Sequence, residues 1–236
     1  MQPSHPKRLP LDLSTPQLPD YPVSLWEALA ITIGAVALVA VGAIGLVYKF
    51  FDNASNPQRA TAIADSLMQY RLPGTVKGVF GTNIGGAKVA IVSTSTFPRD
   101  VSELPTSPET PTGVELFLAK VPPDIETNEF NQQQTSRTYD YGFLGNQDFS
   151  LSYRSGNDFQ ANQERSQNSW FCGVPTTLRI QDGNLFLSPD SAPLAAVKYE
   201  ATALLGNSRR LVTIVAIGRD ADQQATQVFK SLKCKS

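Results

Sequence analysis

One uncharged apolar segment, Ala28 to Tyr48, restricts the possible folds of this chain more than any other feature. As a helix with a rise of 1.5 Å per residue it would be about 31 Å long, close to the hydrocarbon thickness of a bilayer. Lipid offers no hydrogen-bond partners, so a segment that crosses it must be helical. Trp26 and Tyr48 stand at its two ends and Lys49 follows, a pattern typical of the membrane interface. The sequence therefore predicts a transmembrane helix over residues 25–49.

Two other interpretations of this segment fit the sequence less well. A buried core helix would carry a polar stripe, whereas only Thr32 interrupts the apolar run. A signal peptide would begin near residue 1 and would be shorter. The span contains no ionisable residue, so a proton or ion path through it is not expected.

The remaining chain divides into a tail, a short link and one domain. Residues 1–24 contain six prolines and few large apolar residues, which predicts a disordered tail. Residues 50–56 are predicted to be a linker. Residues 57–236 are long enough for one hydrophobic core and are predicted to form a soluble domain.

The two clearest helix signals of that domain lie at its two ends. Asn56-Pro57 is a helix-start signal, and apolar residues recur at helical spacing up to Tyr70. A second helix is predicted from about Asp222, with its apolar stripe at Ala225, Val228, Phe229 and Leu232. Between the helices the pattern changes to strands.

The predicted strands form hairpins. Residues 76–80 and 88–92 are expected to flank a glycine-rich turn, and 114–118 to add a further strand. Residues 139–153 form an aromatic hairpin, and 178–187 form a hairpin with its turn at Asp182-Gly183. Residues 154–169, almost without apolar side chains, are predicted to be a mobile loop.

Residues 194–205 are ambiguous, because their apolar positions fit a helix nearly as well as a strand. A strand is favoured because the short link at Gly206 leads directly into an evident strand at 210–217. The prediction is an α+β fold: an antiparallel β-sheet domain flanked by an N-terminal and a C-terminal helix. This order of elements is similar to that of the small α+β sandwiches of the PsbP-like kind, a resemblance that implies a fold and no site residues.

The charge and histidine content excludes several classes of function. The net charge is −1 and no basic stripe is present, so no nucleic-acid partner is expected. His5, in the tail, is the chain's one histidine, so the domain cannot use Ser-His-Asp or Cys-His catalysis, or most zinc sites. The sequence predicts no catalytic set, no metal site and no cofactor.

Cys172 and Cys234 are candidates for a disulfide that would close a loop of about 60 residues. The alternative is two unrelated thiols; a redox pair lacks the Cys-x-x-Cys spacing. Basic residues before and after the membrane span balance, so they leave the orientation open. A disulfide would favour a domain on the periplasmic, lumenal or extracellular side.

Two further groups of residues are candidates for a binding or catalytic site. Tyr139, Tyr141 and Tyr153 could form an aromatic recognition surface, although the core side of a sheet is the favoured interpretation of these residues. A hydrolase could use a pair of loop carboxylates from among Asp140, Asp148, Asp158 and Glu164.

The leading functional hypothesis is a single-pass membrane-anchored, non-enzymatic binding or assembly domain that acts on another membrane protein. Its expected partners are the bilayer and that protein. One alternative is a membrane-tethered hydrolase that uses the loop carboxylates. Another is a structural subunit of a membrane complex that interacts through its single helix.

Overall fold

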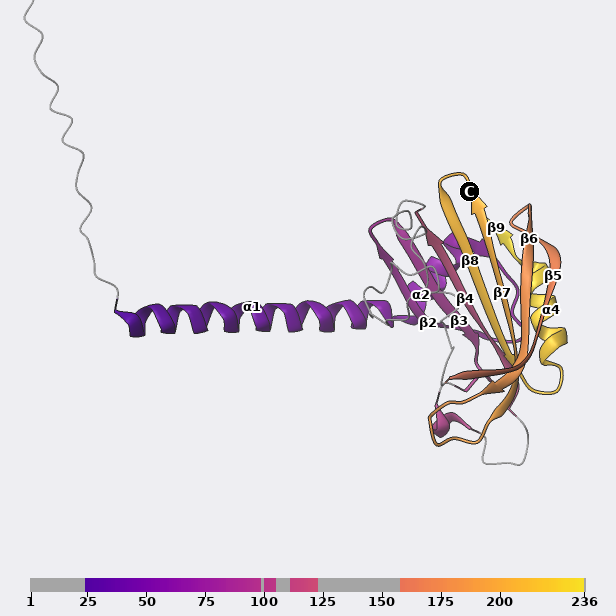
Figure 1. Cartoon of the computed structure of the whole chain (residues 1–236), viewed down its shortest axis with the longest axis horizontal. Helices are drawn as coiled ribbons and strands as arrows, with labels where there is room; N and C mark the ends of the chain where they lie inside the picture. The colour runs from indigo at the N-terminus through magenta and orange to yellow at the C-terminus, as the bar shows by residue number, and fades with distance from the viewer. Residues whose placement is uncertain (1–23, 99, 105–110, 123–157, 236) are drawn as a thin grey trace, which may run out of the picture. The chain divides into compact units, whose positions relative to one another are not determined.

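The computed structural model describes residues 24–98, 100–104, 111–122 and 158–235 of the chain. The chain divides into two compact units, residues 1–48 and 49–236. The described elements, drawn in Figure 1, are α1 (Leu25–Ala54), α2 (Pro57–Leu67), β1 (Met68–Gln69), β2 (Val76–Ile84), β3 (Ala87–Thr94), the short 3-10 helix η1 (Val101–Glu103), β4 (Gly113–Val121), β5 (Phe159–Phe171), β6 (Val174–Leu185), β7 (Leu194–Leu205), β8 (Ser208–Ile217), α4 (Ala221–Ser231) and β9 (Lys233–Cys234).

Helix α1 contains the predicted membrane span. Its 30 residues include a window of mean hydropathy 2.5, and no part of that window is buried within the described part of the chain. Ser24 caps the helix: its hydroxyl accepts from Glu27 N–H, and the Glu27 carboxylate accepts from Ser24 N–H, which is a capping box. The helix continues to Ala54, so most of the linker predicted over residues 50–56 is helical. No glycine or proline stops the helix before Asn56-Pro57.

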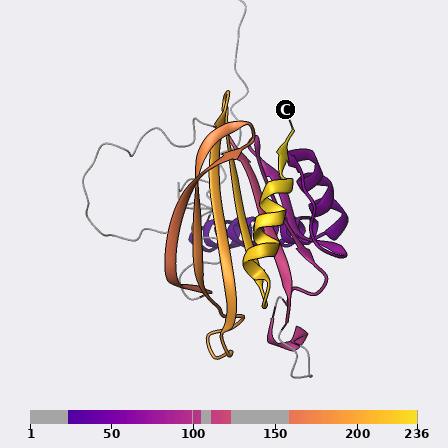
Figure 2. The ribbon, with the colours of Figure 1, turned by 90° about the vertical axis from the view of Figure 1, so that its right-hand side faces the viewer.

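Seven antiparallel strands form one sheet in the order β2-β3-β4-β8-β7-β6-β5. Both helices of the domain pack on the same face of it, α2 on β2 and β3, and α4 on β7 and β8. Figure 2 shows them side by side on that face. We call this the helix face, and the opposite one, on which neither α2 nor α4 packs, the open face. The fold is α+β, as predicted from the sequence.

The helix face carries the main core, in which Val228 and Phe229 of α4 are buried. The predicted stripe of α4 is confirmed, and Leu232 packs at the edge of this core. Helix α2 begins at the predicted cap, where Asn56 Oδ1 accepts from Arg59 N–H at 3.1 Å. It ends at Leu67 rather than Tyr70, because the next two residues form β1 and pair with β9.

The strand prediction for residues 194–205 is confirmed, since β7 covers that range. The hairpin of β2 and β3 is also confirmed, but its strands are longer than expected. Its turn consists of Gly85 and Gly86, whose φ angles of 57° and 85° suit a tight two-residue turn. The tail and the aromatic hairpin at 139–153 lie outside the described residues.

The mobile loop predicted over residues 154–169 is wrong from Phe159 onward. That stretch belongs to β5, a strand of 13 residues at the edge of the sheet. Its polar side chains from Gln160 to Asn168 are exposed, while its backbone pairs with β6. Low apolar content excludes burial of a segment, but it does not exclude pairing through backbone hydrogen bonds.

The hairpin turn predicted at Asp182-Gly183 is also wrong, because β6 runs straight through it. Gly183 faces an irregularity in β5 between Ala161 and Gln163. A methyl group on Gly183 would lie 2.1 Å from the carbonyl oxygen of Gln160, so the close approach of the two backbones requires glycine. The β5–β6 turn is at Cys172-Gly173, where φ is 55° and 79°.

Gly183→Ala is therefore expected to destabilise the domain by about 1–3 kcal/mol, since the edge of the sheet must move to accommodate the methyl group. Urea unfolding of the full chain in a zwitterionic detergent measures the loss. Gly173→Asn, which keeps a residue tolerant of positive φ in the true turn, is the matched control and is expected to cost less. An unchanged midpoint in Gly183→Ala would contradict the close approach.

Candidate functional site

The open face of the sheet carries buried charges in the middle of apolar strands. Side chains alternate along β7, so Val197, Tyr199 and Ala201 face the helices. Lys198 and Glu200 point to the opposite side, and only 2% and 3% of their surfaces are exposed. Two charges buried at such a depth must compensate one another or face a ligand.

Lys198 and Glu200 form an ion pair, with 2.6 Å between Nζ and Oε1. Arg179 on β6 approaches the other oxygen, with 3.6 Å between Nη1 and Oε2. Lys198 also lies over the ring of Phe159, 5.6 Å from its centroid. Burial raises the pKa of the Glu200 carboxyl, and the nearby Lys198 and Arg179 oppose that rise.

Glu164 on β5 completes this charged cluster, which we define as Glu164, Arg179, Lys198 and Glu200. Arg179 holds Glu164 with two hydrogen bonds, Nε to Oε1 at 2.7 Å and Nη2 to Oε2 at 2.6 Å. Gln181 Nε2 also donates to Oε2 at 3.0 Å. These hydrogen bonds, Arg179 first, lower the pKa of Glu164 from 4.5 to about 2.

This arrangement bears on the hydrolase alternative. A carboxyl with so low a pKa stays ionised at ordinary pH and cannot deliver a proton as a general acid must. Asp158, the residue that precedes β5, is exposed. Asp140 and Asp148 lie outside the described residues. The structure therefore gives the loop-carboxylate hypothesis no facing pair of carboxyl groups within the residues it describes.

The Glu164–Arg179 contact predicts a pH dependence. Because the folded-state pKa of Glu164 lies below its ordinary value, its stabilising contribution is present above about pH 4.5 and is lost as the pH falls toward 2. Glu164→Gln is expected to unfold at lower urea than the wild type at pH 7, and the gap should close as the pH falls through that range. A gap that is independent of pH would show that Glu164 does not act through its charge.

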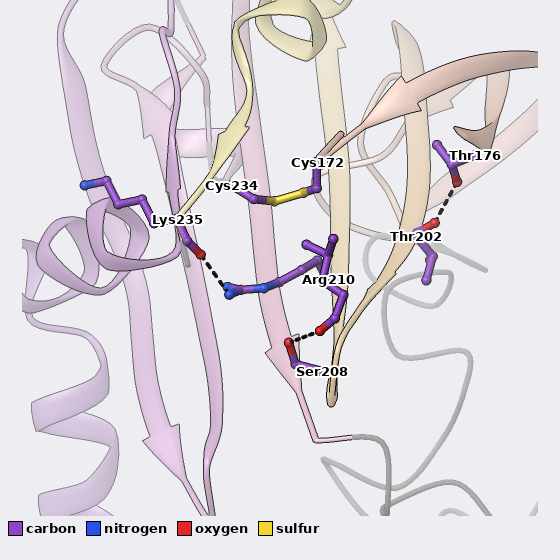
Figure 3. Close-up of a disulfide and its surroundings, with 8 residues drawn as sticks. Cys172, Thr176, Thr202, Ser208, Arg210, Cys234 and Lys235 are labelled. Carbon is purple, nitrogen blue, oxygen red and sulfur yellow. Dashed lines mark hydrogen bonds between the residues drawn. A yellow bond between two sulfur atoms is a disulfide. The ribbon is translucent and has the colours of Figure 1, made fainter. Parts of the chain in front are cut away.

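Beyond the charged cluster, β6 and β7 separate. Their pairing ends at Arg179 and Glu200, while β6 continues with β5 and β7 continues with β8. A hydrogen bond crosses the gap: Thr176 Oγ1 donates to the carbonyl of Thr202 at 2.6 Å (Figure 3). A hollow of about 320 Å³ lies between the strands, lined by Thr176, Thr177, Arg179, Glu200, Ala201 and Thr202. We call it the fork hollow.

A second hollow, of about 440 Å³, lies beside the start of α4 and is lined in part by Asp182, Asp222 and Arg219. Arg165 on β5 forms ion pairs with both of these aspartates: with Asp182, and through Nη2 with Asp222 Oδ1 at 2.6 Å. The Tyr199 hydroxyl also donates to Asp222 Oδ1, at 3.0 Å. The charged groups here hold α4 against β5 to β7 and so serve the packing of the domain.

Cys172 and Cys234 form a disulfide, with 5.1 Å between their Cα atoms (Figure 3). The bond joins the β5–β6 turn to β9. Nearby, Arg210 Nη2 donates to the Lys235 carbonyl at 2.9 Å, and Lys235 N–H donates to the Leu67 carbonyl at 3.1 Å. The last residues of the described chain are thus held by the disulfide and by these two hydrogen bonds.

Of the predicted site residues, the structure brings the two cysteines together, while Tyr139, Tyr141 and Tyr153 lie outside the described residues. Sequence reasoning missed the charged cluster. Its signal was the presence of Lys198 and Glu200, two residues apart, inside the apolar segment LAAVKYEATALL. Among the residues that the structure describes, no three His, Cys, Asp or Glu side chains are grouped as metal ligands, and the absence of a metal or cofactor stays a prediction.

No protein-family model and no curated protein matches this sequence. Among solved structures, the chain is similar to the crystal structure of LpqN, a protein involved in cell envelope biogenesis of Mycobacterium tuberculosis. The two share 10% sequence identity and a TM-score of 0.33, over 75% of this chain and 96% of LpqN. A likeness at that TM-score supports no inference about function, so the functional argument rests on the residues described above.

Proposed function

We propose that this protein is a single-pass membrane-anchored, non-enzymatic binding domain that docks an extended segment of another membrane protein onto the edge of its sheet. A helix long and apolar enough to span a membrane precedes the domain. The disulfide fits an oxidising compartment, so we place the domain on the periplasmic, lumenal or extracellular side.

The observation that carries this proposal is strand β5. Among the described residues it pairs only with β6, which leaves its other edge with unpaired backbone groups. Proteins usually protect such edges with proline, lysine or bulges. From Gln163 to Phe171 the pairing with β6 is regular, and the strand contains neither proline nor lysine.

The charged side chains of β5 do not protect this edge, because they are engaged by the sheet itself. Glu164 is held by Arg179 on the open face, and Arg165 is held by Asp182 and Asp222 on the helix face. The backbone edge between them can accept a partner strand, a recurring mode of peptide recognition.

Proline substitutions at Gln167 and Asn168 test the proposal. Successive residues of an antiparallel strand direct their N–H groups to opposite sides, so one variant removes an N–H from the outer edge and the other removes one that bonds to β6. The outer variant should keep the thermal midpoint of the domain but lose its partner in pull-downs of the tagged full chain from native membranes. The inner variant should lose stability.

Two controls make the result decisive. The full chain should resist carbonate extraction, and replacement of residues 28–48 by an unrelated membrane span should preserve partner capture. Capture that survives the outer-edge proline would overturn edge docking. Capture that is abolished by the span replacement would identify α1 as the interaction element instead.

A further inference from the structure

The fork hollow has a chemical character of its own, separate from the proposed docking edge. Glu200 lies in its wall, and only 3% of the surface of this residue is exposed. Lys198 Nζ lies 2.6 Å from Oε1, whereas Oε2 has only Arg179 Nη1 at 3.6 Å and no partner within hydrogen-bond distance among the described residues. Buried carboxylate oxygens normally accept several hydrogen bonds, so a ligand with O–H or N–H donors would find acceptors there.

The rest of the lining adds groups that both donate and accept. Thr177 and Thr202 are exposed and lie on the open face with Arg179 and Glu200, since Arg179 and Glu200 are cross-strand partners. Their hydroxyls can act as donor or acceptor, whereas the guanidinium of Arg179 only donates. The hollow thus offers a mixed set of hydrogen-bonding groups in a small space.

Net charge argues against an ionic ligand. The charged cluster contains two carboxylates, Glu164 and Glu200, and two cations, Arg179 and Lys198. These four charges balance within the cluster, so the cluster adds no excess charge with which to attract a phosphate or a polyamine. A neutral ligand with many hydrogen-bonding groups matches it better.

Size excludes an inserted peptide strand. Thr176 reaches the Thr202 carbonyl directly, at 2.6 Å, so the two strands are too close there to admit a third between them, which would need about twice the usual 4.8 Å spacing. A volume of about 320 Å³ is at the small end of ligand sites, which run from about 300 to 1,000 Å³.

An exposed aromatic ring lies on the same face of the sheet, on β5, one strand away from the hollow. Trp170 pairs with Pro175, and the alternation along β6 puts both on the open face with Thr177 and Arg179. Its surface is 71% exposed, which is unusual for so large an apolar side chain. Leu204, 62% exposed, lies on the same face at the β7 side.

We infer that the fork hollow binds a neutral polyhydroxylated ligand, one or two sugar rings of a glycan. The sugar hydroxyls would hydrogen-bond to Glu200, Arg179 and the threonines, and the apolar face of a ring would stack on Trp170. This site goes beyond the proposed docking of a protein partner and does not depend on it.

Tryptophan fluorescence of the full chain tests the inference. The chain has two tryptophans, so Trp26→Phe leaves Trp170 as the sole reporter. This variant, in nanodiscs free of glycoside detergents, is titrated with maltotetraose, cellotetraose and chitotetraose, and separately with sulfate and spermidine. At least one tetrasaccharide should give a saturable blue shift, and the two ions should give none.

A double variant provides the matched control. Thr177→Val with Thr202→Val removes two hydroxyls without changing shape or strand propensity, and it leaves the Thr176 hydrogen bond to the Thr202 backbone intact. It should weaken the sugar affinity at least tenfold with an unchanged thermal midpoint. No saturable shift with any tetrasaccharide, equal affinity in the double variant, or tighter binding of either ion would each overturn the inference. Partner capture through β5 would be unaffected by any of these outcomes.

Discussion

Cys172→Ala is expected to lower the free energy of unfolding of the domain by about 4 kcal/mol, because the disulfide closes a loop with a sequence separation of 62 residues. In the chain-entropy model, a loop of that length restricts the unfolded chain strongly. The bond also fastens the β5–β6 turn, in which Cys172 itself has a positive φ of 55°. Urea unfolding of the full chain in a zwitterionic detergent, with and without reductant, measures the effect.

A double-mutant cycle separates the bond from the packing of the two side chains. Cys234→Ala and the double alanine variant should each unfold where Cys172→Ala does, because either single change already removes the bond. On protein from its native host, both cysteines should resist alkylation until reductant is added. Free alkylation without reductant would contradict the bond and, with it, the proposed extracytoplasmic orientation.

Phe229→Ala is expected to cost about 3–5 kcal/mol, the range for large aromatic residues removed from a core. Phe229 is 7% exposed and docks α4 on the sheet. Its ring stacks on Phe171 with centroids 6.0 Å apart and meets the edge of Tyr199 at 6.5 Å. Truncation would leave a cavity between helix and strands that neither ring can fill without moving from its strand.

The same urea assay measures this loss, and two substitutions calibrate it. Phe229→Leu keeps most of the volume and should cost clearly less than alanine. Val101→Ala changes a side chain that is 47% exposed and should shift the midpoint by no more than about 0.5 kcal/mol. A cost below about 1 kcal/mol for Phe229→Ala would mean that α4 does not depend on this contact.

The charged cluster illustrates which part of a site can be found from sequence. Lys198 and Glu200 could have been noticed, because two charges inside an apolar strand are costly unless they are compensated. Their partners could not have been named. Arg179 and Glu164 reach them through the pairing of β5, β6 and β7, whereas the local pattern predicts a loop at Glu164 and a separate hairpin at Arg179.

Local patterns in the sequence were sufficient for the elements whose cause is local. The uncharged run from Ala28 to Tyr48 determined α1, and the stripe of Ala225, Val228 and Phe229 determined α4. The short link at Gly206 was enough to assign 194–205 as a strand. In each case, spacing along the chain reports directly on the surface that one helix or strand must bury.

Tertiary structure alone decided the features that depend on residues far apart in the chain. Polar residues form β5 because β6 supplies backbone hydrogen-bond partners. The hydrophobicity of the side chains gives no information about such pairing. Asp182-Gly183 resembles a turn, but Gly183 is required by the backbone of Gln160, 23 positions earlier. Likewise, the fork hollow exists because β6 leaves β7 to follow β5 toward the turn that the disulfide holds. A local sequence pattern cannot predict these features, because the residues that cause each of them belong to another strand.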